Sequence, residues 1–372
     1  MLPQDTLVLT SQLRDDGQMV VALTQTPLPV PGENEVVIAV EAAPINPSDL
    51  GLLFGPAQTD KARFAPGRVE APVPQAALPG LAGRLGQVLP VGNEGAGTVI
   101  GAGSAAAAQA LMGKRVAAVA GGMFARHRVV PAAACMVLPE GTSAQDGAAA
   151  FVNPLTALAF VETLRSVGGK GIVHTAAASN LGQMLVRLCA AEGVPLVNVV
   201  RKAEQADLLR RLGAAHVLDS TSPTFGEDLR HALTETGADT VFDAIGGGPL
   251  LGTILSAMEL VGRAAAEAYS RYGSTAKKRA YVYGMLDTAP ITLPRDIGFA
   301  WDVSGWLLTP VMEALGPRVR ARMRARVGQD LTTIFASQYK AQVPLSHILD
   351  EDVVHDFNRR ATGAKYLVLP QQ

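Results

Sequence analysis

The chain has 372 residues, of which 48% are hydrophobic and 17% charged. This composition supports a large buried core and argues against disorder, and the length predicts two domains, one of them discontinuous. Lysine and arginine number 32 against 33 acidic residues, which gives a formal charge of -1. Because there is no basic excess, we expect neither a nucleic acid nor an anionic membrane as a partner.

The two cysteines, Cys135 and Cys189, are too few for a four-cysteine zinc site or a disulfide framework. They are compatible with a reducing compartment, and we expect a cytoplasmic protein. The N-terminus has no basic start followed by an apolar run, so no secretory signal is predicted. Residues 95–113 are uncharged but consist mostly of Gly and Ala, which does not indicate a membrane span.

The first 135 residues read as a β-rich module. Strands are predicted over 6–9, 19–23 and 36–40, and an extended loop follows in which two prolines bracket Asn46. The Asn46 side chain either offers its amide to a ligand or bonds to its own backbone. Residues 55–91 are rich in Pro, Ala and Gly, and we expect a long irregular excursion with a helical turn near 78–85.

The pattern changes after Pro139. Ser143 is expected to cap a helix that extends to Leu164. Short strands and helices then alternate over 171–243, which predicts a parallel sheet covered on both faces. A long amphipathic helix is predicted over 249–272, followed by strands at 280–283 and 365–369.

The turn after the first of these parallel strands is built from small residues. Ala176, Ser179 and Gly182 stand where a Gly-x-x-Gly-x-x-Gly pattern would place three glycines. Small residues at such a turn let backbone N–H groups approach a diphosphate, and the following helix adds partial positive charge. Two of the three glycines are missing, so an ordinary turn in an α/β domain is the alternative reading.

Eight short stretches, in the same order along the chain, resemble the zinc-independent medium-chain dehydrogenase/reductase family. Its most similar members are NADPH:quinone oxidoreductases and mitochondrial-type 2-enoyl thioester reductases. The matching stretches are Pro44–Asp49, Gly92–Gly97, Asn153–Ala157, Ala176–Gly182, Asn198–Arg201, Leu212–Val217, Val241–Gly247 and Arg360–Lys365. The resemblance implies an α/β protein in which a Rossmann doubly wound parallel sheet is inserted into a GroES-like β-rich domain.

The domain bounds follow from this resemblance. Residues 1–150 would form the first part of a GroES-like catalytic domain, 151–317 a Rossmann NADPH-binding domain, and 318–372 a return to the catalytic domain. The resemblance also implies that Asn46 and Thr156 approach the nicotinamide and act in catalysis. Met123 and Phe124 are expected either to line the acceptor site or to pack in the core.

Zinc is not expected. The zinc-dependent relatives carry a Cys near the position of Asn46 and a His at the position of Asn93, and amide side chains are poor zinc ligands. The six histidines show no metal-like i, i+4 pairing, and His174 is expected to be a buried strand residue. Without a Lewis acid, reduction of an activated acceptor such as a quinone, enone or enoyl thioester is favoured over alcohol oxidation.

The coenzyme is predicted from the residues after the second parallel strand. NAD-specific turns usually carry Asp or Glu there, whereas this chain has Val200-Arg201-Lys202. Two cations suit a 2′-phosphate, so we predict NADPH. Ser220 is a further candidate contact at the end of the third strand, and the resemblance adds Arg360 as a phosphate ligand. The remaining predicted coenzyme contacts are Ser179, Asn180, Leu181, Gly182, Ala244, Ile245, Tyr283 and Gly284.

One departure from the thioester reductases bears on the acceptor. Their proton-donating Tyr would align with Ala57, and no Tyr precedes Tyr269 in this chain. We therefore predict an NADPH-dependent quinone or enone reductase, with an enoyl thioester reductase or a non-catalytic NADPH-binding protein as alternatives. Tyr269, Tyr272, Tyr281 and Tyr283 are either proton donors or packing residues.

Residues 299–308 are apolar and contain two tryptophans. Relatives use an edge strand in this region for dimerisation, so we expect a homodimer; an internal helix packed on the sheet is the alternative. Five arginines alternate between Arg318 and Arg326, and a solvated helix is expected there rather than a polyanion site.

Overall fold

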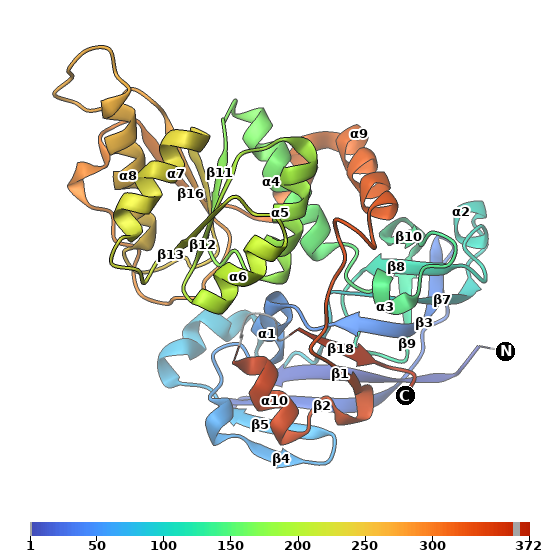
Figure 1. Ribbon diagram of the computed structural model, residues 1–372. Helices are drawn as coiled ribbons and strands as arrows, with labels where there is room; N and C mark the ends of the chain where they lie inside the picture. The colour runs from blue at the N-terminus through green and yellow to red at the C-terminus, as the bar shows by residue number, and fades with distance from the viewer. Residues whose placement is uncertain (1, 360–364) are drawn as a thin grey trace. The chain divides into compact units, whose positions relative to one another are not determined.

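A computed structural model describes residues 2–359 and 365–372. The chain divides into two compact units. Unit 1 contains residues 1–154 and 324–372, and unit 2 contains residues 155–323 (Figure 1). Unit 2 is therefore an insertion within the sequence of unit 1. Among the described residues, no helix has both the length and the apolar character needed to cross a bilayer.

Unit 1 is built on two sheets. The first has the order β4-β5-β2-β1-β6, and the second has the order β10-β8-β7-β3-β18-β17 with β9 paired to β3. The strands are β1 (Asp5–Leu13), β2 (Gln18–Pro27), β3 (Glu35–Pro44), β4 (Arg63–Ala65), β5 (Arg68–Pro72), β6 (Leu89–Pro90), β7 (Glu94–Ala102), β8 (Arg115–Val119), β9 (His127–Pro131), β10 (Cys135–Val137), β17 (Ala341–Pro344) and β18 (Tyr366–Leu369).

Helices of unit 1 are short. They are α1 (Pro47–Leu53), α2 (Ala106–Gln109), α3 (Ala144–Gly147) and α10 (Glu351–Asn358), with 3-10 turns η1 (Thr59–Lys61), η2 (Gln75–Arg84), η3 (Ala132–Ala134) and η5 (Leu345–His347). One apolar core joins both sheets to α1 and α10, with Leu9, Ile38 and Phe54 almost fully buried in it. The C-terminal strand β18 pairs with β3, so the last residues complete a sheet begun by the first forty-four.

The excursion expected to be irregular over 55–91 is in fact ordered. Residues 63–72 form the hairpin β4–β5, which turns at Gly67 in the left-handed region (φ 66°) and pairs with β2. Val69 and Ala71 alternate inward on β5 and are fully buried, which provides the apolar face that a strand needs. The expectation failed because this face is only two residues long. The predicted helical turn is present as η2.

Unit 2 is a six-stranded parallel sheet of order β13-β12-β11-β14-β15-β16. The strands are β11 (Ile172–His174), β12 (Leu196–Val200), β13 (His216–Asp219), β14 (Thr240–Asp243), β15 (Lys278–Val282) and β16 (Trp301–Gly305). In chain order this is 3-2-1-4-5-6, the doubly wound order of dinucleotide-binding domains. The order reverses between β11 and β14, and ligands of such sheets bind at the carboxyl ends of these strands.

Helices cover both faces of this sheet. The helices from 152 to 329 are α4 (Val152–Ser166), α5 (Asn180–Glu192), α6 (Ala203–Arg211), α7 (Phe225–Thr236), α8 (Leu250–Ala264) and α9 (Leu308–Gln329), which is kinked at Gly316, with the 3-10 turn η4 (Arg295–Ile297). Figure 1 shows α7 and α8 on one side and α5 and α6 on the other. One core cluster packs α7 and α8 against the strands through Leu229 and Ile254, and another packs α5 and α6 through Val186 and Leu209.

Two predicted helices are shorter in the structure. Ser143 does cap a helix, because its Oγ accepts a hydrogen bond from Asp146 N at 3.1 Å, but α3 ends at Gly147 and α4 starts at Val152. The break arises because the N–H groups of Phe151 and Val152 donate to the Glu94 carboxylate (2.9 and 3.0 Å). These donors are thereby satisfied outside a continuous helix.

The helix predicted over 249–272 ends at Ala264. The fully buried Glu259 carboxylate accepts hydrogen bonds from Arg263 Nε (2.7 Å), Ser274 N (2.7 Å) and Lys278 Nζ (2.5 Å). These bonds fold the chain back toward α8, and Gly273 turns it at φ 91°. A buried carboxylate is stable only when it is paired. The hydrogen bonds to Glu259 therefore compete with continuation of helix α8 beyond Ala264.

Within residues 299–308, Trp301–Gly305 form the edge strand β16 rather than an internal helix. β16 pairs only with β15 within the six-stranded sheet, and the flanking Phe299 and Leu307 are 81% and 67% exposed. The arginine-rich segment lies on α9, as predicted. Arg322 pairs there with Glu162 at 2.8 Å, a surface contact of the solvated kind expected.

Candidate active site

The small-residue turn follows β11 at the edge where the strand order reverses. Ser179 is the N-cap of α5, and its Oγ accepts a hydrogen bond from Gly182 N at 3.2 Å. Ala176 has φ 49° and is the only non-glycine residue with a positive φ among those described. Such a conformation is costly away from glycine and is found mainly where function requires it. The first position of the pattern therefore keeps the backbone shape of a glycine although it is an alanine.

Gly182 is the position where only glycine fits. A Cβ there would lie 2.0 Å from the carbonyl oxygen of Ala177, which no neighbouring side-chain movement relieves because the obstacle is backbone. This close approach of α5 to the turn after β11 is the role of the third glycine in dinucleotide-binding turns. The turn thus has the capped helix N-terminus, compact backbone and tight packing that a diphosphate site needs. Asn180 and Leu181 form the first residues of the same helix.

A buried carboxylate ties this turn to the end of β14. Asp243 Oδ1 accepts from Thr175 Oγ1 (2.6 Å) and from Ile245 N (3.0 Å), and its Oδ2 accepts from Gly246 N (3.1 Å). The Thr175 Oγ1 in turn accepts from Ala244 N at 2.8 Å. Ala244 and Ile245, both predicted coenzyme contacts, are therefore held at the switch point by the side chains of Thr175, which follows β11, and Asp243, which ends β14.

The ends of β14 and β15 approach each other through two glycines. A Cβ on Gly246 would lie 2.1 Å from Gly284 O, and one on Gly284 would lie 2.4 Å from Ala244 O. Tyr283 precedes Gly284, and its Oη lies 2.7 Å from Nε2 of the fully buried His174. Burial lowers the pKa of His174 to about 3 and raises the pKa of Tyr283. His174 is therefore a neutral, buried strand residue, as expected.

Two exposed cations follow β12. Arg201 and Lys202 are both exposed, and neither side chain forms an ion pair with another described residue. Arg201 N donates to Gln205 Oε1 (3.2 Å), and Lys202 is the N-cap residue of α6. Ser220 N donates to Val200 O at 2.8 Å, which places Ser220 beside the end of β12. The three predicted residues lie together at the carboxyl ends of β12 and β13.

Asn46 lies in unit 1 as the N-cap residue of α1, and it is buried. Its Nδ2 donates to Glu94 Oε1 at 2.9 Å, and its backbone N–H donates to Asp49 Oδ2 at 2.8 Å. Asp49 Oδ1 also accepts from Asn93 N at 2.8 Å. Asn46 Oδ1 makes no hydrogen bond with another described residue. The Asn46 loop is thus fixed by two buried carboxylates, one from α1 and one from β7.

The buried Nζ atom of Lys365 lies near these carboxylates. Burial lowers the pKa of Lys365 to about 8, while the charges of Glu94 and Asp49 act in the opposite direction. Burial raises the pKa of Asp49 to about 7, against the hydrogen bonds it accepts from the backbone of Asn46 and Asn93. Lys365 Nζ itself has no hydrogen-bond partner among the described residues, although it lies 5.9 Å from the ring centroid of Tyr339.

Other predicted site residues lie as follows. Thr156 is buried within α4, and Arg360 lies outside the described residues. Met123 and Phe124 are both fully buried in the core of unit 1. The described residues contain no group of three His, Cys, Asp or Glu side chains positioned to hold a metal ion.

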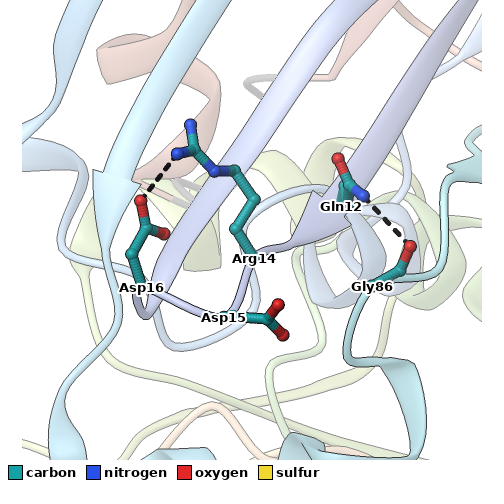
Figure 2. Close-up of a pocket in the computed structure, with 5 residues that line it drawn as sticks. All are labelled: Gln12, Arg14, Asp15, Asp16 and Gly86. Carbon is teal, nitrogen blue, oxygen red and sulfur yellow. Dashed lines mark hydrogen bonds and ion pairs between the residues drawn. The ribbon is translucent and has the colours of Figure 1, made fainter.

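A small surface pocket of unit 1 contains none of the predicted residues. It is lined by Gln12, Arg14, Asp15, Asp16 and Gly86, and its polar groups are largely paired (Figure 2). Arg14 pairs with Asp16 at 2.8 Å, and Gln12 Nε2 donates to Gly86 O at 3.0 Å. This pocket carries no chemistry that relates to the site.

Sequence reasoning missed the supporting residues of the site. The sequence predicts no role for Glu94, Thr175 or Asp243, although each is buried and bonded to a predicted residue. The sequence does contain a signal for such supporting residues. It is a polar residue at the end of a short apolar strand or directly beside it. Thr175 follows β11 and Asp243 ends β14, the two strands that flank the switch point.

Several known proteins are similar to this chain. The family model for zinc-binding dehydrogenases matches residues 181–283. Prostaglandin reductase-3 of Bos taurus is 26% identical over 242 residues, covering 65% of this chain and 57% of that protein. The mitochondrial enoyl-[acyl-carrier-protein] reductase of Xenopus tropicalis is 31% identical over 196 residues, covering 50% of this chain and 49% of the other. The chain thus spans about half the length of the curated relatives it matches.

Structural similarity extends over the whole chain. A crystal structure from Mesorhizobium loti, classed as a candidate NADPH:quinone reductase, matches with a TM-score of 0.75 and 27% identity. The match covers 100% of both chains. The predicted fold class is therefore confirmed: a Rossmann parallel sheet lies, in sequence, within a GroES-like β-rich part.

Proposed function

We propose that this chain transfers a hydride from NADPH to a quinone or another α,β-unsaturated carbonyl acceptor. The premise is that the chain belongs to the zinc-independent medium-chain dehydrogenase/reductase superfamily. Membership makes the chain an oxidoreductase, and the coenzyme and acceptor are the parts proposed. The relatives named as a candidate NADPH:quinone reductase and as a prostaglandin reductase support this choice.

The observation that carries the proposal is the pair of exposed cations after β12, which form no ion pair with another described residue. Arg201 and Lys202 stand where an NAD-specific domain holds the ribose with a carboxylate, and both side chains are exposed. A guanidinium binds phosphate through paired N–H donors, so this position favours the 2′-phosphate of NADPH. Arg360 remains a proposed second phosphate ligand.

The turn after β11 fits the rest of a dinucleotide. Ser179 caps α5, Ala176 has a left-handed backbone, and Gly182 packs where no Cβ is tolerated. We propose that Ser179, Asn180, Leu181 and Gly182 hold the diphosphate. Ala244, Ile245, Tyr283 and Gly284 are proposed to contact the remainder of the coenzyme, because they follow β14 and β15 at the same sheet edge.

Bound NADPH supplies the hydride, and the chain supplies position and charge. The Asn46 amide is fixed by Glu94, and we propose that Asn46 and Thr156 orient the reacting groups. The residues at the family's zinc positions carry amide side chains, which are poor ligands for Zn²⁺. The Asn46 Nδ2 already donates a hydrogen bond to the Glu94 carboxylate, so these side chains do not suit a zinc site. An acceptor activated by its own conjugation is therefore the proposed substrate.

An enoyl thioester reductase is the second candidate, and the identity of 31% to an enoyl-[acyl-carrier-protein] reductase favours it. The position of the family's proton-donating tyrosine carries Ala57, whose side chain is buried and has no proton to donate. This favours quinones, whose reduced oxygens take protons from water readily. A non-catalytic NADPH-binding protein on the same fold is the third candidate.

The test is NADPH oxidation, followed at 340 nm, with 1,4-benzoquinone, 9,10-phenanthrenequinone and crotonyl-CoA as acceptors. We expect turnover of a quinone and little or none of crotonyl-CoA. Turnover of crotonyl-CoA alone would establish the thioester reductase instead. Tight NADPH binding without turnover of any acceptor would favour the non-catalytic protein.

A further inference from the structure

We propose that Glu94 is a positioning residue that sets the orientation of the Asn46 amide and the start of helix α4. This inference deepens the proposed function, because it explains how Asn46 would be held for catalysis. It rests on hydrogen bonds within unit 1 and concerns a residue to which neither the sequence motif nor the fold assigns a role.

Glu94 is the first residue of β7, and it is completely buried. Both of its carboxylate oxygens accept hydrogen bonds from groups far away in the sequence. Oε1 accepts from Asn46 Nδ2 at 2.9 Å, and Oε2 accepts from the backbone N–H groups of Phe151 (2.9 Å) and Val152 (3.0 Å). One side chain thus links the α1 loop to the first residue of α4, the helix that carries Thr156.

The bonds of Glu94 determine which atom of the Asn46 amide remains available. Because a carboxylate only accepts, it selects the Nδ2 end of the amide, and Oδ1 is directed elsewhere. Asn46 Oδ1 is buried and makes no hydrogen bond with another described residue. A buried acceptor without a partner is costly in the free protein. It would be satisfied by a ligand that offers a hydrogen-bond donor.

A quinone or enone carbonyl has no such donor. The carboxamide and ribose hydroxyl groups of a nicotinamide nucleotide do, so the free Oδ1 suits the coenzyme rather than the acceptor. Glu94 would therefore serve coenzyme placement through Asn46. Its buried charge is balanced by Lys365, which faces Glu94 and Asp49 and makes no hydrogen bond of its own among the described residues.

The isosteric substitution Glu94→Gln tests this directly. The two backbone N–H groups require an oxygen, which leaves the new NH2 group facing Asn46 Nδ2, donor against donor. The Asn46 amide must then rotate by a half-turn or lose its bond. We expect kcat/KM for NADPH to fall about tenfold, with a smaller change in the KM for the acceptor. Glu41→Gln changes a partly exposed carboxylate on β3, and this matched control should retain wild-type kinetics.

A readout that does not depend on turnover separates this inference from the proposed function. In protein labelled with 15N-asparagine, the Asn46 side-chain amide should give a resonance pair that exchanges slowly with water and disappears in Asn46→Asp. Glu94→Gln should shift this pair and speed its exchange. If the wild type reduces no acceptor but the resonances respond in this way, the proposed function fails and the positioning role stands. Unchanged Asn46 resonances in Glu94→Gln would overturn the positioning role of Glu94.

A second variant serves as a control for any loss of stability caused by Glu94→Gln. Glu94→Gln leaves Lys365 with less counter-charge, whereas Glu94→Gln/Lys365→Met removes both charges and should recover most of any loss in Tm. The recovered variant should still show the shifted Asn46 resonances and the reduced kcat/KM. Wild-type kinetics in this double variant would show that Glu94 acts only through stability. In a double-mutant cycle, Asn46→Ala and Glu94→Gln should be strongly non-additive, and additive losses would contradict the proposal.

Discussion

The Thr175 hydroxyl donates a 2.6 Å hydrogen bond to Asp243 Oδ1 and so joins the ends of β11 and β14, the two strands between which the sheet order reverses. Both residues are buried, and the same hydroxyl accepts from Ala244 N. The proposed coenzyme edge of unit 2 is thus held together by a polar contact between residues that are 68 positions apart.

Removing this contact should destabilise the fold and loosen the coenzyme edge. Thr175→Val keeps the shape of the side chain but leaves Ala244 N without its acceptor, so we expect a loss of about 1–3 kcal/mol in the free energy of unfolding. Urea denaturation measures it. Thr221→Val removes an exposed Thr–Asp hydrogen bond of 2.8 Å and should cost about 0.5 kcal/mol or less. Equal losses would refute the buried role of Thr175.

Gly182→Ala should disturb the turn itself. The added Cβ would lie 2.0 Å from Ala177 O, so α5 must move away from the turn that follows β11. We expect a loss of about 1–3 kcal/mol and weaker NADPH binding, measured by thermal unfolding and by coenzyme fluorescence. In the control Gly226→Ala, no atom lies within 4 Å of the new Cβ on α7, and stability should be unchanged or higher. NADPH binding by Gly182→Ala at wild-type affinity would argue against the diphosphate turn.

Arg201→Ala tests the coenzyme choice. Loss of one charge-assisted contact to a phosphate should raise the Kd for NADPH about 10- to 100-fold and leave the Kd for NADH nearly unchanged. Titration of each coenzyme into the protein gives both values. Arg211→Ala, at the exposed end of α6, should affect neither. If both coenzymes weakened equally, the 2′-phosphate assignment would be wrong.

The buried His174 should contribute to acid instability. Its folded pKa of about 3 lies below the ordinary value of about 6.5, so the unfolded chain binds the additional proton between these values. Stability contributed by neutral His174 is therefore full above about pH 6.5 and falls as the pH is lowered, by up to about 1.4 kcal/mol per pH unit.

His174→Gln removes this titration and keeps an acceptor for the Tyr283 hydroxyl. Urea unfolding at pH 7 and pH 4.5 should show a smaller loss of stability on acidification in this variant than in the wild type. His231→Gln changes a 74% exposed side chain and should keep the wild-type difference. An identical pH dependence in all three proteins would contradict the buried, neutral state.

The homodimer stays a prediction, and the edge strand β16 makes it testable. Phe299 and Leu307 flank this strand and are 81% and 67% exposed, so a second copy could cover them. Sedimentation velocity should show a dimer, and Phe299→Glu should shift it toward the monomer. Val30→Glu, at an 89% exposed position of unit 1, is the control. A wild-type monomer at all concentrations would exclude the dimer.

The regular elements were predictable where a local pattern was long. The alternation of strands and helices over 171–243 appears as predicted, because each element carries its own apolar face. Prediction failed where a distant side chain intervened. The helix expected from Ser143 to Leu164 is interrupted because the Glu94 carboxylate accepts hydrogen bonds from two backbone N–H groups. The helix expected to reach 272 ends early because the Glu259 carboxylate accepts hydrogen bonds from Ser274 and Lys278. The hairpin over 63–72 was missed because its apolar face is only two residues long.

The sequence alone determined the alternation of strands and helices over 171–243, the small-residue turn after β11, the absence of an acid after β12, and the amides at the family's zinc positions, because each is a local choice of residue type. Only the tertiary structure decided how these pieces are held. The bonds from Glu94 to Asn46 and from Thr175 to Asp243 join residues 48 and 68 positions apart. Such contacts form only when strand pairing brings distant residues together. Burial then makes a carboxylate stable only where hydrogen-bond donors surround it.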